Sequence, residues 1–248
     1  MPTNKEITSY SNKLLAIDKF NDYCPNGMQI EGKKNIKKII TAVSVNLELI
    51  NKAIAAKADL ILVHHGIFWE NDNKSITGPL RNKIALLLKN NINLIAYHLP
   101  LDAHPKLGNN IEIARILNIK NASPIGDTLI WQGEFENKIS LDDLSMLITN
   151  RLNRKPLIFS PKHKIVKKIA WCSGAAQNYI DKIIDMDFDA YLSGEVSERI
   201  PHLAIENNVA YISAGHYATE KYGVQALGKH LSAKFSIEHE FIDIYNIV

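Results

Sequence analysis

Two adjacent histidines at the end of an apolar segment are the residues best placed to carry chemistry. Residues 60–63 are leucine, isoleucine and valine, and His64, His65 and Gly66 follow them. The segment is too short for the core of a helix, so we predict a buried strand of a parallel sheet, apolar on both faces. Ligands of such sheets bind at the carboxyl ends of strands, where these histidines lie and where Gly66 is predicted to let the chain turn. The two imidazoles are either metal ligands or hydrogen-bonded core residues.

Further nitrogen and carboxylate side chains stand where predicted strands end or helices begin: His98, Asp102, Glu195, His216 and Glu220. Taken singly, Asp102 is interpreted as a turn residue and Glu220 as an exposed helix residue. His216 and Glu220 are four residues apart, so they share one face if a helix begins near His216. Taken together, these side chains at corresponding strand ends favour a pair of divalent metal ions. Because the set contains no thiolate, it indicates Zn, Fe or Mn rather than a cysteine-rich structural zinc site.

Two similar successions of strands and helices are predicted to position these side chains. Strands are predicted to start near residues 37, 60 and 92, and again near residues 167, 190 and 209, with helices between them. Lys37 and Lys167 are separated by 130 residues, as are Asp59 and Asp189. This repetition predicts an α/β fold of two pseudo-repeated α/β domains, with a metal site in the cleft between them.

The boundary between the two domains is predicted at residues 121–124, whose sequence Asn-Ala-Ser-Pro is typical of a linker. The first α/β unit, residues 1–124, then carries the candidate ligands up to Asp102. The second, residues 125–248, carries those from Glu195 onwards, and its C-terminal segment is expected to cross back to the first.

The composition is that of an ordinary globular protein. Of the 248 residues, 46% are hydrophobic and 22% are charged, and the formal net charge of +3 is too small to require a nucleic-acid partner. Cys24 and Cys172 lack the spacing of a zinc ribbon. We see neither the apolar segment of a secretory signal nor an apolar run long enough to span a bilayer. We therefore expect a cytoplasmic protein that makes no membrane contact.

Basic side chains gather at two predicted strand entries, around Lys37 and Lys38 and around Lys167 and Lys168, the second group including Lys162. Such patches can bind phosphate backbones without reading bases. The aromatic side chains that single-strand binding uses are missing there. A solvated surface is the simpler interpretation, which leaves nucleic acid a weakly supported partner.

Several motifs, in their order along the chain, resemble those of a known family. They are Asn26-Gly27-Met28-Gln29 with Glu31-Gly32, Val63-His64-His65-Gly66, His98-Leu99-Pro100-Leu101-Asp102, Ser193-Gly194-Glu195 and Gly215-His216-Tyr217-Ala218-Thr219-Glu220. Together they resemble the Nif-three-like family of dinuclear-metal proteins, the GTP cyclohydrolase 1 type 2 homologs. The likeness covers nearly the whole chain, whose length is similar to that of the short bacterial form.

The resemblance implies a metal centre, an assembly and an activity. It implies that two divalent ions per subunit (Fe, Zn or Mn) are held by His64, His65, Asp102, His216 and Glu220, with Glu220 bridging. It further implies two interlinked α/β domains per subunit and a homohexamer that forms a toroid. The implied activity is that of a dinuclear metal-dependent hydrolase, in which a metal-bound water attacks a nucleotide ring.

Two residues are candidates for proton transfer in such a reaction. His98 is expected to act as general acid or base. Glu195 is a second candidate, and is otherwise a carboxylate at the N-terminus of a helix. The alternative function is a metal-binding hexameric scaffold with a regulatory or DNA-repair-associated, nucleic-acid-binding role and no GTP chemistry.

Overall fold

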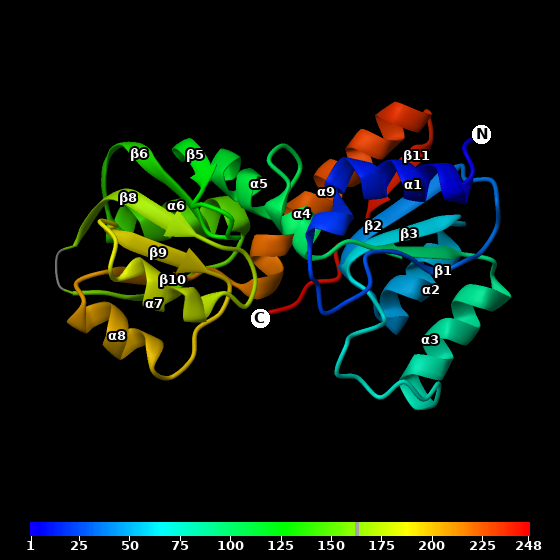
Figure 1. Ribbon diagram of the computed structural model, residues 1–248, viewed down its shortest axis with the longest axis horizontal. Coiled ribbons are helices and arrows are strands. Elements are labelled where there is room, and N and C mark those ends of the chain that lie inside the picture. The colour runs from blue at the N-terminus through cyan, green and yellow to red at the C-terminus, as the bar shows by residue number, and fades with distance from the viewer. Residues whose placement is uncertain (162–163) are drawn as a thin grey trace. The chain divides into compact units, whose positions relative to one another are not determined.

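The computed structural model describes residues 1–161 and 164–248, which form two units with a sheet each (Figure 1). The first unit comprises Met1–Gly108 and Gly223–Tyr245, and the second comprises Asn109–Tyr222 and Asn246–Val248. Strands alternate with helices in both units, which confirms the predicted α/β class. Within the described residues, no helix has the length and apolar character needed to cross a membrane.

The first unit contains a five-stranded sheet in the order β1-β4-β3-β2-β11. Its strands are β1 (Gly27–Ile30), β2 (Lys38–Ser44), β3 (Leu60–His65), β4 (Asn93–Ala96) and β11 (Glu238–Phe241). Strands β4, β3, β2 and β11 run parallel, and β1 pairs antiparallel with β4. The helices are α1 (Asn4–Leu15), η1 (Ile17–Lys19), α2 (Leu47–Ala55), α3 (Gly78–Lys89), α4 (Leu99–Ala103) and the C-terminal part of α9 (His216–Phe235).

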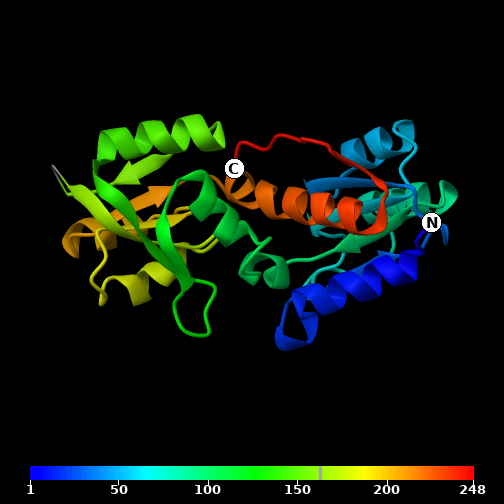
Figure 2. The ribbon, with the colours of Figure 1, turned by 90° about the horizontal axis from the view of Figure 1, so that it is seen from above.

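Helices cover both faces of this first sheet. Ile61 of β3 lies in the same buried cluster as Leu49 of α2, while its neighbour Leu62 lies in the cluster that contains Leu227 of α9. Figures 1 and 2 show α1 and the C-terminal part of α9 on one face of the sheet, and Figure 1 shows α2 and α3 on the other. Because successive residues of β3 meet different helices, the strand has to be continuously apolar until it ends at the histidines.

The second unit contains a six-stranded sheet in the order β5-β6-β8-β9-β10-β7. Its strands are β5 (Lys120–Pro124), β6 (Trp131–Ser140), β7 (Leu157–Phe159), β8 (Ile165–Trp171), β9 (Ala190–Ser193) and β10 (Ala210–Ser213). Strands β8, β9 and β10 are parallel, and the other three pair antiparallel with their neighbours. The helices are α5 (Asn109–Ile116), α6 (Leu141–Leu152), η2 (Gln177–Tyr179), α7 (Ile180–Ile183), α8 (Ile200–Glu206) and the first turns of α9.

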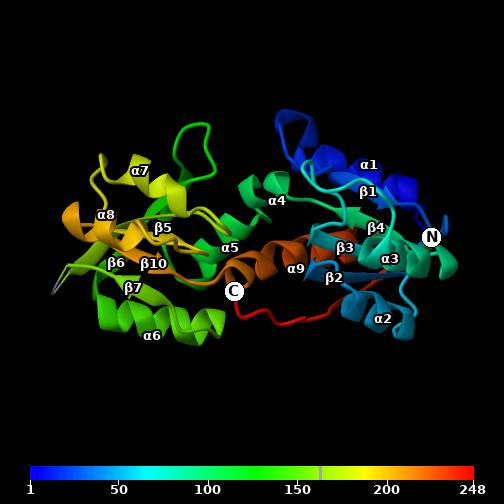
Figure 3. The ribbon, with the colours of Figure 1, turned by 90° about the horizontal axis from the view of Figure 1, so that it is seen from below.

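The second sheet is also covered on both faces. Leu192 of β9 is buried in the cluster that includes Ile148 of α6, and Tyr191 is buried in the cluster that includes Ile180 of α7 and Ile200 of α8. Figure 3 shows α6 on one side of this sheet and α7 and α8 on the other. Strands β9 and β10 are therefore buried along their length, and the chain becomes accessible only beyond their ends.

The parallel parts of the two sheets follow one pattern. Ile39 of β2 pairs with Leu60 of β3. Ile169 of β8 pairs with Ala190 of β9, and each member of this second pair lies 130 residues after its counterpart in the first. The same spacing separates the aspartates that directly precede β3 and β9. Asp59 accepts hydrogen bonds from two consecutive backbone N–H groups at the start of β2, and Asp189 accepts two from the equivalent residues of β8.

The division of the chain differs from the one predicted at residue 124. The N-terminal stretch of the first unit ends at Gly108, and the C-terminal segment returns to this unit, as expected, because β11 pairs with β2. The segment 121–124, which has the composition of a linker, lies in β5 and pairs antiparallel with β6. Small polar residues at an edge of a sheet are tolerated because only one side of the strand is paired, so composition alone misplaces the boundary.

Candidate metal centre

His64 lies at the carboxyl end of β3 and is oriented by the neighbouring strand. Its side chain is fully buried, and its Nδ1 atom is 2.9 Å from the carbonyl oxygen of Tyr97. Because a carbonyl oxygen only accepts hydrogen bonds, Nδ1 carries a proton and donates it to this bond. A hydrogen bond of this kind to the second ring nitrogen is the usual way in which a metal-binding histidine is held, with Nε2 left to face the ion.

Nε2 of His64 faces the carboxylate of Asp102, which α4 carries. The distance from Nε2 to Oδ2 of Asp102 is 3.5 Å, and both residues are buried. A nitrogen lone pair and a carboxylate oxygen repel each other at this distance unless a positive charge accompanies them. A divalent cation, or a proton on His64, removes that repulsion. The chemistry of this donor pair therefore fits a metal ion such as Zn, Fe or Mn.

Two further imidazoles join His64 in the first unit. The ring centroids of His64 and His65 are 4.7 Å apart, and those of His64 and His98 are 5.0 Å apart. Each of the three residues offers a nitrogen within 4.8 Å of the others. Nδ1 of His65 is also 2.8 Å from the hydroxyl oxygen of Ser44, which fixes the ring. The predicted strand-end residues of the first unit thus do form one cluster.

Asp22 orients His98 and was not among the residues predicted from sequence. Its Oδ1 atom is 2.9 Å from Nδ1 of His98, and its Oδ2 atom accepts hydrogen bonds from the side chain of Asn26 and the backbone of Leu99. Burial by itself would raise the pKa of Asp22, but the hydrogen bonds from His98 and Asn26 outweigh it and lower the pKa to about 2. The only sequence signal was the neighbouring Asn26 motif.

The low pKa of Asp22 predicts a pH-dependent contribution to stability. Its ordinary value is 3.8 and its folded value is about 2. The stabilisation is therefore complete above pH 3.8 and is lost as the pH falls through about 2. We expect Asp22→Asn to lower the free energy of unfolding of the metal-free protein by about 1–3 kcal/mol at pH 6. The difference from wild type should shrink as the pH approaches 3, as followed by urea denaturation. The same loss in Asp18→Asn, which alters an exposed carboxylate, would contradict this assignment.

In the second unit, a histidine and two carboxylates meet at the start of α9. Nε2 of His216 is 2.9 Å from Oε2 of Glu220, one helical turn along, and Nδ1 of His216 is 2.6 Å from Oε1 of Glu195. Burial by itself would lower the pKa of His216, but Glu220 and Glu195 raise it to about 9. The site therefore favours a positive charge. Glu195 contacts the ring nitrogen opposite Glu220, as carboxylates that orient a metal-binding histidine do.

Two glycines, one in each unit, make room for polar side chains. The position a Cβ atom would take on Gly66 is 2.3 Å from Oε1 of Gln29, which also accepts a hydrogen bond from the N–H of Ile67. Gly66 does not have a positive φ, so the close approach of Gln29, and not a left-handed backbone, explains a glycine at this position. Gly174 has φ +68°, and a Cβ there would be 2.1 Å from Oε1 of Glu220. A larger residue at either site would therefore have to displace Gln29 or Glu220, and at Gly174 the positive φ would add strain.

The structure places the candidate ligands in two sets, one in each unit. His64, His65, His98 and Asp102 cluster at the ends of β3 and β4 in the first. Glu195, His216 and Glu220 cluster at the ends of β9 and β10 in the second. Asp22 and Gly174 belong to these surroundings and were missed, because their contacts depend on segments distant in the sequence.

Comparison with known proteins agrees with these features. A family model described as Duf34/NIF3 (NGG1p interacting factor 3) matches residues 2–246. A protein of Haemophilus influenzae named GTP cyclohydrolase 1 type 2 homolog is 46% identical over 98% of this chain and 98% of its own length. A protein of the same name from Pseudomonas aeruginosa is 42% identical over 97% of this chain and 96% of its own.

A solved structure described as protein ybgI, of unknown function, has a TM-score of 0.95 and 39% identity to the chain. The match covers 99% of this chain and all of that one. The sequence relatives and the solved structure extend over essentially the whole chain, so they cover both sets of candidate ligands. The chain therefore belongs to the Duf34/NIF3 family.

Proposed function

We propose that the protein is a dinuclear divalent-metal-dependent hydrolase that acts on a nucleotide ring. His64, His65 and Asp102 of the first unit and His216 and Glu220 of the second would hold the two ions. The observation that carries the proposal is that each unit brings imidazole and carboxylate groups together where strands end or a helix begins, and that His64, Asp102 and Glu220 among them are buried. When bound, two such ions would supply Lewis acids and lower the pKa of water.

The residues around these ligands have separate tasks in the proposal. His98, held through Nδ1 by Asp22, keeps Nε2 for proton transfer as general acid or base. Glu195 holds Nδ1 of His216, so we assign it a positioning role rather than the direct catalytic role considered from sequence. Asp22, like Glu195, is assigned to positioning. The homohexameric assembly implied by the resemblance stays a prediction.

The choice of a nucleotide substrate is supported by the name of the relatives, GTP cyclohydrolase 1 type 2 homolog. The scaffold alternative receives little support from the basic groups. Lys38 pairs with Glu240 at 2.7 Å, and Lys168 pairs with Asp187 at 2.5 Å. Lys167 donates hydrogen bonds to two backbone carbonyls. These cations are already engaged within the chain, whereas Lys162 lies outside the described residues.

The proposal is tested with a nucleotide panel of GTP, GDP, ATP and guanosine. The protein is loaded in turn with Mn, Zn and Fe(II), its metal content is measured, and ring opening is followed by absorbance and chromatography. We expect turnover of GTP by the loaded protein, loss to background after chelation and recovery when metal is restored. Asp102→Asn should stay at background with metal present. Absence of turnover throughout the panel, by protein confirmed to hold two ions, would refute the proposed activity.

A further inference from the structure

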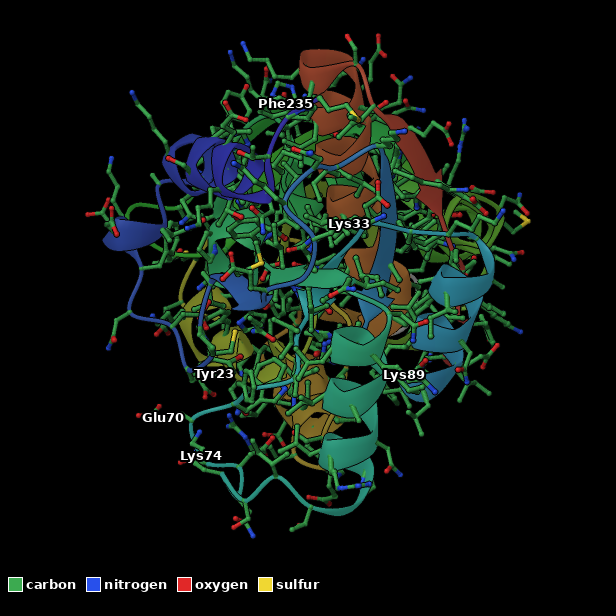
Figure 4. All side chains as sticks on the ribbon, turned by 90° about the vertical axis from the view of Figure 1, so that its right-hand side faces the viewer. Tyr23, Lys33, Glu70, Lys74, Lys89 and Phe235 are labelled. Carbon is green, nitrogen blue, oxygen red and sulfur yellow. The ribbon has the colours of Figure 1, made fainter. Side chains whose placement is uncertain are left out.

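The first unit has a hollow beside His98 that the proposed chemistry does not use. Its volume is about 430 Å³, within the range of small-molecule sites. Residues from two loops line it: Asp22, Tyr23, Cys24 and Pro25 between η1 and β1, and Phe68, Trp69, Glu70 and Lys74 between β3 and α3. Figure 4 shows Tyr23, Glu70 and Lys74 near one another on these loops.

Two aromatic rings form one wall of the hollow. The ring centroids of Tyr23 and Trp69 are 5.8 Å apart with an interplanar angle of 31°. The two loops are tied together, because the N–H of Glu70 donates to the carbonyl oxygen of Tyr23 at 2.8 Å. Lys74 donates to the carbonyl oxygen of Trp69 and so holds the second loop in place. Hydrogen bonds thus hold together the two loops that carry the rings, and half of the Tyr23 residue is exposed.

The same rings contact the histidine assigned to proton transfer. Trp69 meets His98 edge to face, with centroids 5.3 Å apart and an angle of 83°. The ring centroids of Tyr23 and His98 are 5.0 Å apart, and the angle between the two ring planes is 74°. The ring centroids of Trp69 and His65 are 5.7 Å apart. A planar group stacked on Tyr23 or Trp69 would therefore lie within reach of the imidazole cluster.

We propose that Tyr23 and Trp69 form a stacking platform for the heterocyclic base of the substrate, with Glu70 selecting guanine. This inference rests on the proposed function, whose substrate it makes specific. Every base has an aromatic face, so the platform supplies affinity for any base. Glu70 is an exposed residue that lines the hollow, and its side chain ends in a carboxylate. A carboxylate accepts two hydrogen bonds from the adjacent N1–H and N2–H donors of guanine, whereas the same edge of adenine presents one donor and one acceptor.

Asp22 does not compete for this selecting role. Both of its carboxylate oxygens accept hydrogen bonds from His98, Asn26 and Leu99, which fixes them within the protein. The exposed side chain of Glu70 instead stands on the loop that carries Trp69. The hollow therefore combines a stacking wall with an accepting edge, as a site for a guanine base requires.

The test measures binding as well as turnover. GTP, ATP and inorganic triphosphate are titrated calorimetrically into the full chain, both metal-loaded and chelated. We expect Tyr23→Leu and Trp69→Leu to weaken GTP binding about 10- to 100-fold. Their binding of inorganic triphosphate and their metal content should stay unchanged. Trp69→Phe, which keeps an aromatic face, should recover most of the affinity. Glu70→Gln should lower the preference for GTP over ATP about tenfold.

Controls separate this inference from folding defects and from the proposed activity. Tyr245→Leu alters a tyrosine that is 66% exposed and distant in sequence, and should bind GTP normally. If Trp69→Leu fails to fold, the Tyr23→Leu variant, which changes a half-exposed residue, tests the platform by itself. GTP binding that depends on the two rings without any turnover would uphold the platform and refute the hydrolase. Wild-type affinity in both leucine variants, or no GTP binding by the wild-type chain, would overturn the platform.

Discussion

His65→Ala and Glu220→Ala are each expected to hold fewer divalent ions than the wild-type chain, which we expect to hold up to two per subunit. Each variant removes one of the five side chains proposed to bind the ions. The resulting loss of metal affinity should exceed the roughly 10- to 100-fold loss caused by removing a residue that only orients a ligand. Metal content is measured by elemental analysis after dialysis against a buffered concentration of Mn, Zn or Fe(II). The folded state is confirmed by circular dichroism.

Matched controls come from the exposed surface at α8 of the second unit. His202 and Glu198 form an ion pair near α8, with side chains 73% and 91% exposed. Alanine at either position also removes an imidazole or a carboxylate, but should leave the metal content at the wild-type level. Two ions retained in both His65→Ala and Glu220→Ala would contradict the ligand assignment. An equal loss in the two control variants would show that the measurement reports surface binding.

The strand ends and their chemistry could be read from the sequence because they depend on local pattern. The apolar residues of β3 stop at His64 since both faces of the strand are covered up to that point. The spacing of His216 and Glu220 places them on one helix face, where they are 2.9 Å apart. Such features need only the period of the secondary structure and the rule that parallel strands end at one edge.

Other features depend on contacts that no local pattern encodes. Asp22 reaches His98 across 76 residues of sequence, and Gln29 fills the space that Gly66 leaves. The boundary between the units was likewise hidden, because β5 resembles a linker, whereas the return of the C-terminal segment was expected and β11 does pair with β2. Tertiary packing decides all of these. Residue types alone could not indicate which distant segments would meet.

The repeated aspartates Asp59 and Asp189 give the second large expected effect. Oδ2 of Asp59 is 2.6 and 3.1 Å from the backbone nitrogens of Lys37 and Lys38. Asp59 is buried, and it also pairs with Lys33. Asp59→Ala leaves two N–H donors without this acceptor, and hydrogen bonds to charged groups contribute about 1.5–3 kcal/mol each without being additive. We expect a loss of about 2–4 kcal/mol in the free energy of unfolding.

Asp189→Ala should cost less than Asp59→Ala, although it removes an equivalent pair of bonds at 2.8 and 2.9 Å. The side chain of Asp189 is 34% exposed, so water replaces part of what is lost. Urea denaturation of metal-free protein, with probes in both units, measures the two losses. Asp187→Ala, which removes a carboxylate 94% exposed, should change stability little. Equal stability of Asp59→Ala and wild type would mean that the hydrogen bonds of Asp59 to the start of β2 do not stabilise the fold.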